Sequence, residues 1–281
     1  MKVLLVGGSS SLALAVRTAL PSSIDVVSGG RHGCDVQLDL MSPAEELLIP
    51  SVDTVINCAA NFGGTAAPQM LAAEDVNVLG VLKLAQACFL GGASHFLSVS
   101  SIFATLNSGS PFFNVYALSK RHSDELLQLY CRQAGMPLTI LRPGQFYGEW
   151  DSFRMHQPLI YSFLDKAESG EEIVINGNND ALRNFVYVDD VAQVIVRIIE
   201  RAVLGTYNCC ALRNVRFSQI AERAVEAVGS QSEIRFDRSK PDIPDNGFDA
   251  DNTLFQAIDF QPKVSLSEGF QKIVARRRLV S

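Results

Sequence analysis

The hydrophobic and polar positions in the first half of the chain follow two alternating patterns. Short apolar runs of strand length recur, and longer segments with apolar residues at helical spacing lie between most of them. The predicted strands are Val3–Val6, Ile24–Ser28, Val36–Leu38, Thr54–Cys58, His95–Val99 and Leu138–Leu141. The predicted helices are Ser11–Leu20, Gln69–Leu90 and Tyr116–Ala134. This alternation is typical of an α/β protein with a doubly wound parallel sheet.

After Gly148 the pattern is less regular. It predicts a helix over Met155–Ser169, a short strand over Glu172–Ile175 and a further helix over Val191–Arg201. Residues 237–251 are rich in Pro, Asp and Asn, which predicts a surface loop. With 281 residues, 47% of them hydrophobic, the chain has enough apolar surface for the core of one large or two modest domains.

Charge and cysteine content narrow the classes of function. The net charge is −6 and the one basic run, Arg276–Arg278, fits a last helical turn, so nucleic-acid binding is disfavoured. The six cysteines lack metal-ligand spacing and the four histidines are scattered, so we predict no metal site. We interpret the cysteines as reduced thiols of a cytoplasmic protein. No apolar run approaches the roughly 18 residues of a membrane span, and no signal-peptide pattern precedes the first strand.

The first predicted strand runs directly into the small residues Gly7-Gly8-Ser9-Ser10-Ser11. A strand, a small-residue turn and a helix form the context of a dinucleotide-binding turn, in which the helix N-terminus faces a pyrophosphate. The glycines of that motif would fall on positions 7, 10 and 13, where this chain has Gly7, Ser10 and Ala13. Ala13 is small enough, and the Ser10 hydroxyl could donate a hydrogen bond to a phosphate oxygen. The same turn also occurs in other α/β loops.

Tyr116 and Lys120 form a Tyr-x-x-x-Lys pattern in the predicted helix 116–134. Four residues are about one helical turn, so both side chains leave the same face. A nearby cation favours the phenolate, and we expect Lys120 with an oxidised nicotinamide to lower the pKa of Tyr116 from its usual value of about 10. Such a pair suits proton transfer, although Tyr and Lys meet at this spacing in many helices.

A third feature is the segment Ser98-Val-Ser-Ser-Ile102 at the end of the predicted strand 95–99. A serine at the C-terminal end of a strand in an open α/β sheet can reach a substrate carbonyl. The alternative is an ordinary polar strand end. Taken with the turn and the Tyr-Lys pair, the segment favours a site for a dinucleotide and a carbonyl compound.

Together these features resemble the extended short-chain dehydrogenase/reductase family, in particular its NAD-dependent epimerase/dehydratase branch, which acts on nucleotide sugars. The resemblance covers nearly the whole chain. Further matching segments are Asp53–Ala60, Asn77–Gly80, Leu141–Gly148, Arg183–Ala192, Gly205–Asn208 and Ser265–Gly269. The resemblance implies a Rossmann domain over 1–148 and 184–205, and a smaller α+β substrate-binding lobe over 149–183 and 206–281.

The resemblance also implies roles for individual residues. Tyr116 would transfer the proton, Lys120 would hold the nicotinamide ribose, and Ser101 or Ser100 would hydrogen-bond the carbonyl oxygen. The residues expected to bind the cofactor are Gly7, Ser9, Ser10, Ser11, Leu12, Arg31, Asp39, Leu40, Cys58, Ala59, Ala60, Asn77, Tyr116, Lys120 and Pro143. The residues expected to bind the substrate are Gln145, Arg183, Arg238 and Lys240. Three of these four are basic, which suits a diphosphate.

Departures from the family pattern help to choose the reaction. Dehydratases of this family carry an Asp-Glu pair after the catalytic hydroxyl residue, where this chain has Ile102 and Phe103, which cannot titrate. Epimerase-reductases resemble the chain less, because no cysteine lies near Ser101. The remaining options are a ketoreductase, expected to act at the sugar C4, and an epimerase that retains its cofactor.

The end of the second predicted strand bears on the choice of cofactor. An NAD-preferring site places an Asp or Glu here to accept hydrogen bonds from the ribose 2′-OH. This chain has Ser28 and then Arg31, which would instead accommodate a 2′-phosphate. We therefore predict that NADP(H) is preferred and that NAD(H) is possible. The alternative is that Arg31 points to solvent.

Two readings from other classes of function stay open. One is a non-catalytic NAD(P)-binding regulator, motivated by Ser10 and disfavoured by the intact Tyr116 and Lys120. The other is a reductase of a non-nucleotide carbonyl compound, disfavoured by Arg183. Related enzymes often pair through two helices, here 69–90 and 116–134, so we expect a homodimer.

Overall fold

A computed structural model describes residues 1–280, which divide into two compact units. Unit 1 comprises Met1–Pro143, Ala192–Cys209 and Thr253–Phe260; unit 2 comprises Gly144–Val191, Cys210–Asn252 and the described part of Gln261–Ser281. The bounds differ from the expected ones: residues 144–148 and 184–191 lie in unit 2, and 206–209 and 253–260 lie in unit 1. Strand pairing explains most of the difference, because each of these segments stays with the strand or helix that it contacts.

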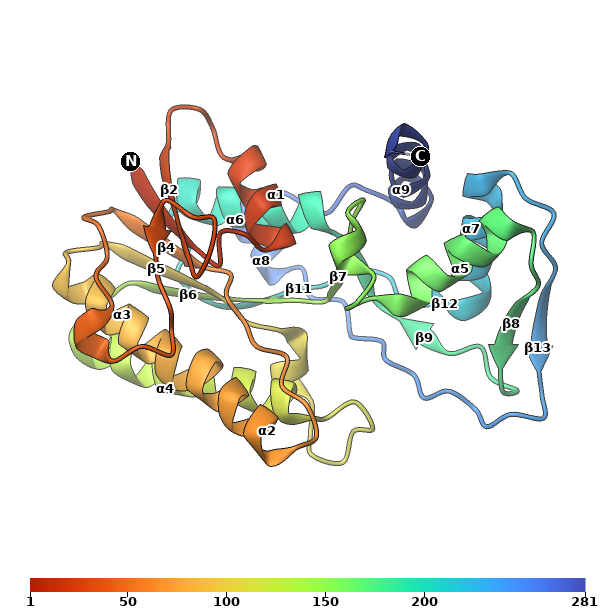
Figure 1. Ribbon diagram of the computed structural model, residues 1–281, viewed down its shortest axis with the longest axis horizontal. Helices are drawn as coiled ribbons and strands as arrows, with labels where there is room; N and C mark the ends of the chain where they lie inside the picture. Colours follow the sequence, from red (N-terminus) through yellow and green to blue (C-terminus); the bar gives the residue numbers. More distant parts are fainter. Residues whose placement is uncertain (281) are drawn as a thin grey trace. The chain divides into compact units, whose positions relative to one another are not determined.

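Unit 1 is built on a seven-stranded sheet in the order β11-β6-β5-β4-β1-β2-β3, and every pairing is parallel (Figure 1). Its strands are β1 Lys2–Val6, β2 Asp25–Gly30, β3 Val36–Gln37, β4 Thr54–Asn57, β5 His95–Val99, β6 Leu138–Pro143 and β11 Gly205–Cys209. The strand order reverses at β1 and β4, where the C-terminal strand ends of such sheets bind ligands. The predicted doubly wound parallel sheet is confirmed.

Helices cover both faces of this sheet, with α1 and α6 on one side and α3 and α4 on the other (Figure 1). The helical segments are α1 Ser11–Ala19, η1 Ala44–Glu46, α2 Ala67–Glu74, η2 Asp75–Gly80, α3 Val81–Leu90, η3 Ile102–Thr105, α4 Val115–Ala134, α6 Val188–Arg201 and α8 Thr253–Ile258. The predicted helix Gln69–Leu90 is thus a continuous run of α2, the π-helical turn η2 and α3. Helix α6 begins in unit 2 and ends in unit 1.

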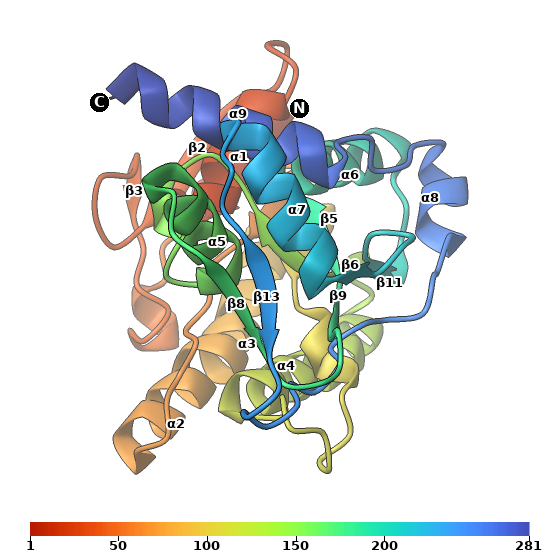
Figure 2. The ribbon, with the colours of Figure 1, turned by 90° about the vertical axis from the view of Figure 1, so that its right-hand side faces the viewer.

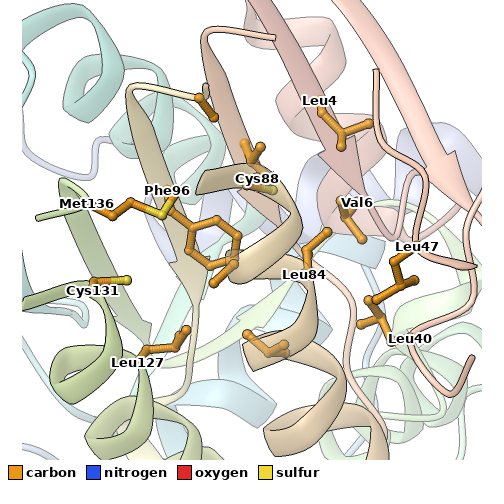
Figure 3. Close-up of a cluster of buried hydrophobic side chains, with 14 of the residues drawn as sticks. Leu4, Val6, Leu40, Leu47, Leu84, Cys88, Phe96, Leu127, Cys131 and Met136 are labelled. Atoms are coloured by element: carbon orange, nitrogen blue, oxygen red, sulfur yellow. The ribbon is translucent and has the colours of Figure 1, made fainter. Parts of the chain in front are cut away.

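A core of buried side chains fills the space between the sheet and the helices α3 and α4 (Figure 3). Phe96 of β5 packs with Leu84 and Cys88 of α3 and with Leu127 and Cys131 of α4. Burying a Leu or Phe side chain contributes roughly 1.5–3 kcal/mol, so this layer holds α4 firmly against the strand ends. All six cysteines are free thiols.

The described part of unit 2 contains three two-stranded sheets and several helical segments, and β8 lies beside β13 (Figure 2). The strands are β7 Gln145–Tyr147, β8 Ile173–Asn176, β9 Leu182–Arg183, β10 Phe185–Tyr187, β12 Val215–Arg216 and β13 Ile234–Asp237. β10 pairs with β7 and β13 with β8 in parallel, whereas β12 pairs with β9 antiparallel. The helical segments are η4 Asp151–Phe153, α5 Pro158–Ser169, α7 Phe217–Val228 and α9 Leu266–Val280. Helix α7 packs against both α5 and α9.

The predicted surface loop 237–251 follows β13 and is irregular apart from one isolated bridge. It is tied down by side chains: Asp245 Oδ1 accepts from the Leu182 backbone N–H at 2.8 Å, and Asp242 Oδ1 accepts from the Asn178 N–H at 2.5 Å. Across residues 1–280, no helix is both long and apolar enough to span a membrane.

Candidate active site

The start of α4 positions the two residues of the Tyr-x-x-x-Lys pattern. Asn114 caps the helix by accepting a hydrogen bond from the Ala117 N–H at 3.0 Å, which places Tyr116 in the first turn and Lys120 in the second. Lys120 is 3% exposed, and its Nζ donates to the carbonyl oxygen of Val99, the last residue of β5, at 2.9 Å. The ammonium group is therefore anchored to the strand end that precedes Ser100 and Ser101.

Tyr116 is half-buried between an aromatic neighbour and polar groups of unit 1. Its ring stacks on Phe62, with centroids 4.8 Å apart and planes 21° apart. Lys120 Nζ lies 5.9 Å from the Tyr116 ring centroid. The phenol hydroxyl makes a hydrogen-bonding contact with the Ser101 side chain. The structure thus brings Tyr116, Lys120 and Ser101 together, as the resemblance implied.

The acidity of Tyr116 differs from the prediction. Burial raises the pKa of Tyr116 to about 12, the Ser101 contact lowers it, and the Asp124 carboxylate raises it further. The protein groups alone therefore raise the pKa of Tyr116 above its usual value, which is opposite to the predicted lowering. Burial lowers the pKa of Lys120 to about 8, against the opposing effects of Asp124 and Cys58. At neutral pH the pair consists of a protonated phenol and a charged ammonium group.

The two candidate serines have different neighbours. Ser101 caps η3 by accepting from the Phe103 N–H at 3.2 Å, and its side chain contacts Tyr116. The Ser100 side chain instead faces the Asp124 carboxylate and lowers the pKa of Asp124. Only Ser101 therefore shares a neighbourhood with the phenol hydroxyl among these two residues.

Asn77 braces the segment that carries Phe62. Its Oδ1 accepts from the Asn61 N–H at 2.7 Å, and its Nδ2 donates to the Asn61 carbonyl at 2.7 Å and to Ser119 Oγ at 2.9 Å. Asn77 is fully buried, so its amide acts through these neighbours. The Ser119 hydroxyl in turn donates to the Tyr116 carbonyl at 3.1 Å. Among the residues expected to bind the cofactor, Asn77 is placed as a support for the Tyr116 region.

The small-residue turn after β1 requires a glycine at its first position and places a serine cap at the start of α1. Gly7 has φ +74°, and a Cβ added there would lie 2.7 Å from the Ala59 nitrogen, so only glycine fits. Ser10 caps α1 by accepting from the Ala13 N–H at 3.3 Å, which leaves its own hydroxyl proton available to a phosphate. Ser9 is exposed, Ser11 is half-buried, and Leu12 is buried with only its backbone at the helix start.

The ends of the neighbouring strands supply the remaining positions. Cys58 and Ala59 after β4 are half-buried, Ala60 is exposed, and Pro143 ends β6 in a buried position. Asp39 Oδ1 accepts from the Met41 N–H at 3.0 Å, and Leu40 is buried. These residues and the turn suit a dinucleotide, because small side chains and the N-terminus of α1 lie at the C-terminal ends of the strands.

A carboxylate that sequence reasoning missed lies at the end of β2. Asp35 Oδ2 accepts from the Ser28 backbone N–H at 2.8 Å and from its hydroxyl at 2.7 Å. These hydrogen bonds hold the pKa of Asp35 below its usual value. Arg31 is exposed in the same loop. Asp35 lies seven residues after Ser28 in the sequence, in the loop that follows β2, so the spacing from the small-residue turn to β2 did not indicate it.

In unit 2, Gln145 and Arg183 both contact the 244–246 segment. Asn246 Nδ2 donates to Gln145 Oε1 at 3.4 Å, and Arg183 Nη1 donates to the Pro244 and Leu182 carbonyls at 3.0 and 2.7 Å. The Arg183 guanidinium carbon lies 4.5 Å from the Phe217 ring centroid, and burial lowers the Arg183 pKa. Arg238 and Lys240 are exposed in the turn after β13.

Comparison with known proteins agrees with these features. The model of the NAD dependent epimerase/dehydratase family matches residues 10–210. A dTDP-4-dehydro-6-deoxy-D-allose reductase of a Streptomyces species is 30% identical over 240 residues, which cover 78% of this chain and 73% of that protein.

Solved structures share the fold over the whole chain. A UDP-glucuronic acid 4-epimerase from Bacillus cereus in complex with NAD has a TM-score of 0.81 at 18% identity, and covers 100% of both chains. RMD from Pseudomonas aeruginosa complexed with NADPH has a TM-score of 0.78 at 20% identity, also covering 100% of both chains. The predicted resemblance is confirmed: the chain belongs to the NAD-dependent epimerase/dehydratase family of NAD(P)-dependent enzymes.

Proposed function

We propose that this protein is an NAD(P)-dependent 4-ketoreductase of a nucleotide-diphosphate sugar. The observation that carries the proposal is the placement of Tyr116 beside Ser101 and Lys120, with Lys120 anchored at the end of β5. The similarity to a dTDP-4-dehydro-6-deoxy-D-allose reductase supports the same reaction and a nucleotide-sugar substrate.

The residues of unit 1 suit the proton transfer that accompanies reduction of the carbonyl group. A bound nicotinamide cofactor supplies the hydride. The Ser101 hydroxyl donates a hydrogen bond to the carbonyl oxygen, and Tyr116 gives its proton to the alkoxide that develops there. Lys120 places a positive charge beside the phenolate that remains. Gly7 and Ser10 would hold the pyrophosphate at the N-terminus of α1.

The proposed preference for NADP(H) favours reduction over epimerisation, because a reductase exchanges its cofactor at every turnover whereas an epimerase keeps it. The similarity to a dTDP-4-dehydro-6-deoxy-D-allose reductase favours reduction as well. Ile102 and Phe103, which have no titratable group, disfavour a dehydratase.

The experiment is to supply a dTDP-4-keto-6-deoxyhexose and follow NADPH absorbance. Stoichiometric consumption of NADPH supports the reductase. Interconversion of dTDP-hexoses by protein that is purified with its cofactor, without added NADPH, would identify the epimerase instead. Binding of NADPH without either reaction would identify a cofactor-binding regulator.

We further propose a preference for NADP(H), with NAD(H) accepted. The exposed Arg31 can pair with a 2′-phosphate, whereas the Asp35 carboxylate repels one. Arg31→Ala should therefore weaken NADPH binding about tenfold and leave NADH binding unchanged. Asp35→Asn keeps an acceptor for Ser28 and should tighten NADPH binding. Calorimetric titration with both cofactors measures the ratio, and a loss of affinity for both alike in Arg31→Ala would contradict it.

The remaining assignments concern the substrate, the assembly and the location. We propose that Gln145, Arg183, Arg238 and Lys240 of unit 2 contact the nucleotide sugar. We also propose a homodimer through α2, α3 and α4, which is supported by exposed apolar side chains such as Leu71, Leu90 and Leu129. Light scattering tests the dimer. The free thiols support a cytoplasmic location.

A further inference from the structure

One turn beyond Lys120, helix α4 carries a third ionisable residue on the same face. Tyr116, Lys120 and Asp124 are four residues apart, and we call these three the α4 stripe. Asp124 is 1% exposed, and its Oδ2 accepts a hydrogen bond from Arg142 Nε of β6 at 2.7 Å. A fully buried carboxylate is costly unless cations compensate it.

The carboxylate is not fully used by this ion pair. Within residues 1–280, neither Asp124 Oδ1 nor Ser100 Oγ has a partner at normal hydrogen-bond geometry, and both atoms are buried. Burial raises the pKa of Asp124, while Ser100, Arg142 and Lys120 lower it. The ion pair with Arg142 therefore does not account for both oxygens of the Asp124 carboxylate.

Asp124 acts electrostatically on both other members of the stripe. It favours the charged form of Lys120 and the protonated form of Tyr116. Cys58 after β4 and Tyr116 on α4 itself also face Lys120. Arg142 balances Asp124 from β6. The single carboxylate therefore serves two cations and a phenol.

We propose that Asp124 is a positioning residue for the proton transfer, a buried counter-charge on the Tyr116–Lys120 face of α4 that Arg142 of β6 holds in place. This role rests on the proposed reductase function. Its electrostatic part can be measured without any substrate, because Lys120 titrates within an accessible pH range.

The test follows the lysine 13Cε signals of 13C-lysine-labelled protein against pH, with the Lys120 signal assigned from a Lys120→Arg variant. Lys120 should titrate near pH 8 in the unaltered protein. Asp124→Asn, which has nearly the same shape and still accepts from Arg142, should lower that midpoint by about one pH unit. The matched control is Glu125→Gln, the same change at the exposed neighbouring residue, which should leave the midpoint unchanged. Equal midpoints in Asp124→Asn and the unaltered protein would overturn the proposal.

A second variant covers the case in which Asp124→Asn does not fold. Asp124→Leu with Arg142→Met removes both charges together, and such replacements of buried pairs are often neutral for stability. The Lys120 midpoint should again fall, and an unchanged midpoint overturns the proposal. In the reductive direction, the basic limb of the kcat profile should move to lower pH in step with the Lys120 signal. A shifted midpoint without NADPH consumption by the unaltered protein would refute the reductase and leave the charge coupling standing.

Discussion

Polar side chains are buried in both units, but their hydrogen-bonding capacity is used differently. In the α4 stripe of unit 1, burial shifts the pKa of all three residues, and Lys120 makes its hydrogen bond to a strand end. In unit 2, Arg183 and Asn184 direct their donors to nearby carbonyls and amides that hold chain segments together. The buried residues of the α4 stripe can therefore change their protonation state, whereas Arg183 and Asn184 of unit 2 hold chain segments together.

The largest expected effect tests whether Tyr116 is the proton donor. Tyr116→Phe removes the proton donor and should lower kcat for NADPH-dependent reduction by about 10²- to 10⁴-fold, with cofactor affinity kept. Tyr130→Phe, further along α4, is the control and should keep near-normal turnover. Turnover by Tyr116→Phe close to that of the control would show that the stripe is not the proton source.

The second effect is a pH dependence of stability that arises in unit 1. Lys120 titrates near pH 8 in the folded protein, against 10.5 for an ordinary lysine. Between these pH values the unfolded chain binds more protons than the folded protein, so the free energy of unfolding rises with pH. The stabilisation that depends on a neutral Lys120 is fully present above pH 10.5 and is lost as the pH falls through 8. The difference corresponds to about 3 kcal/mol in the free energy of unfolding.

Urea unfolding at several pH values measures this contribution. The stability of the unaltered protein should rise relative to a Lys120→Met variant as the pH is raised across that window. Lys272→Met, an exposed lysine that pairs with Asp189 in unit 2, is the control and should give a curve parallel to that of the unaltered protein. A parallel curve for Lys120→Met as well would contradict the burial of a charged Lys120.

Sequence reasoning found the parts of this picture that depend on local spacing. The Tyr116–Lys120 pair, the strands β1, β4 and β5, and the turn at Gly7 follow from periodicity and small residues. Asp124 continues the same spacing, but its burial depends on how β5 and β6 pack against α4, which no local pattern reports.

Other elements were missed for reasons of tertiary structure. Only one of the five residues of β11 is buried, with three half-buried and one exposed, so its apolar signal is weak. Asp35 reaches Ser28 because a loop folds back, and Phe62 reaches Tyr116 because Asn77 braces the intervening chain. In each case, the contact is decided by partners that are distant in the sequence.

The third prediction tests whether Arg183 stabilises the fold of unit 2. Arg183→Ala leaves the Leu182 and Pro244 carbonyls without this donor and removes the contact with Phe217, so the free energy of unfolding should fall by about 2–4 kcal/mol. The exposed Arg238→Ala should change stability by less than about 0.5 kcal/mol. If Arg183→Ala left urea unfolding unchanged, the contrast between the units would fail, whatever the effect of this substitution on KM.

The smallest expected effect is that of a substitution at Phe62, which contacts the reacting phenol but is not part of the buried core. Its ring stacks on Tyr116, yet its side chain is exposed, so it adds little to the core and should matter chiefly for the placement of the phenol. Aromatic stacking contributes about 0.5–1.5 kcal/mol, so Phe62→Leu should lower kcat by roughly two- to tenfold with little change in unfolding. Phe89→Leu, at another exposed position of unit 1, controls for the loss of a surface ring. If the free energy of unfolding fell by as much as the barrier to reaction rose, Phe62 would have a structural role instead, because a residue that only orients Tyr116 should lower kcat without lowering stability.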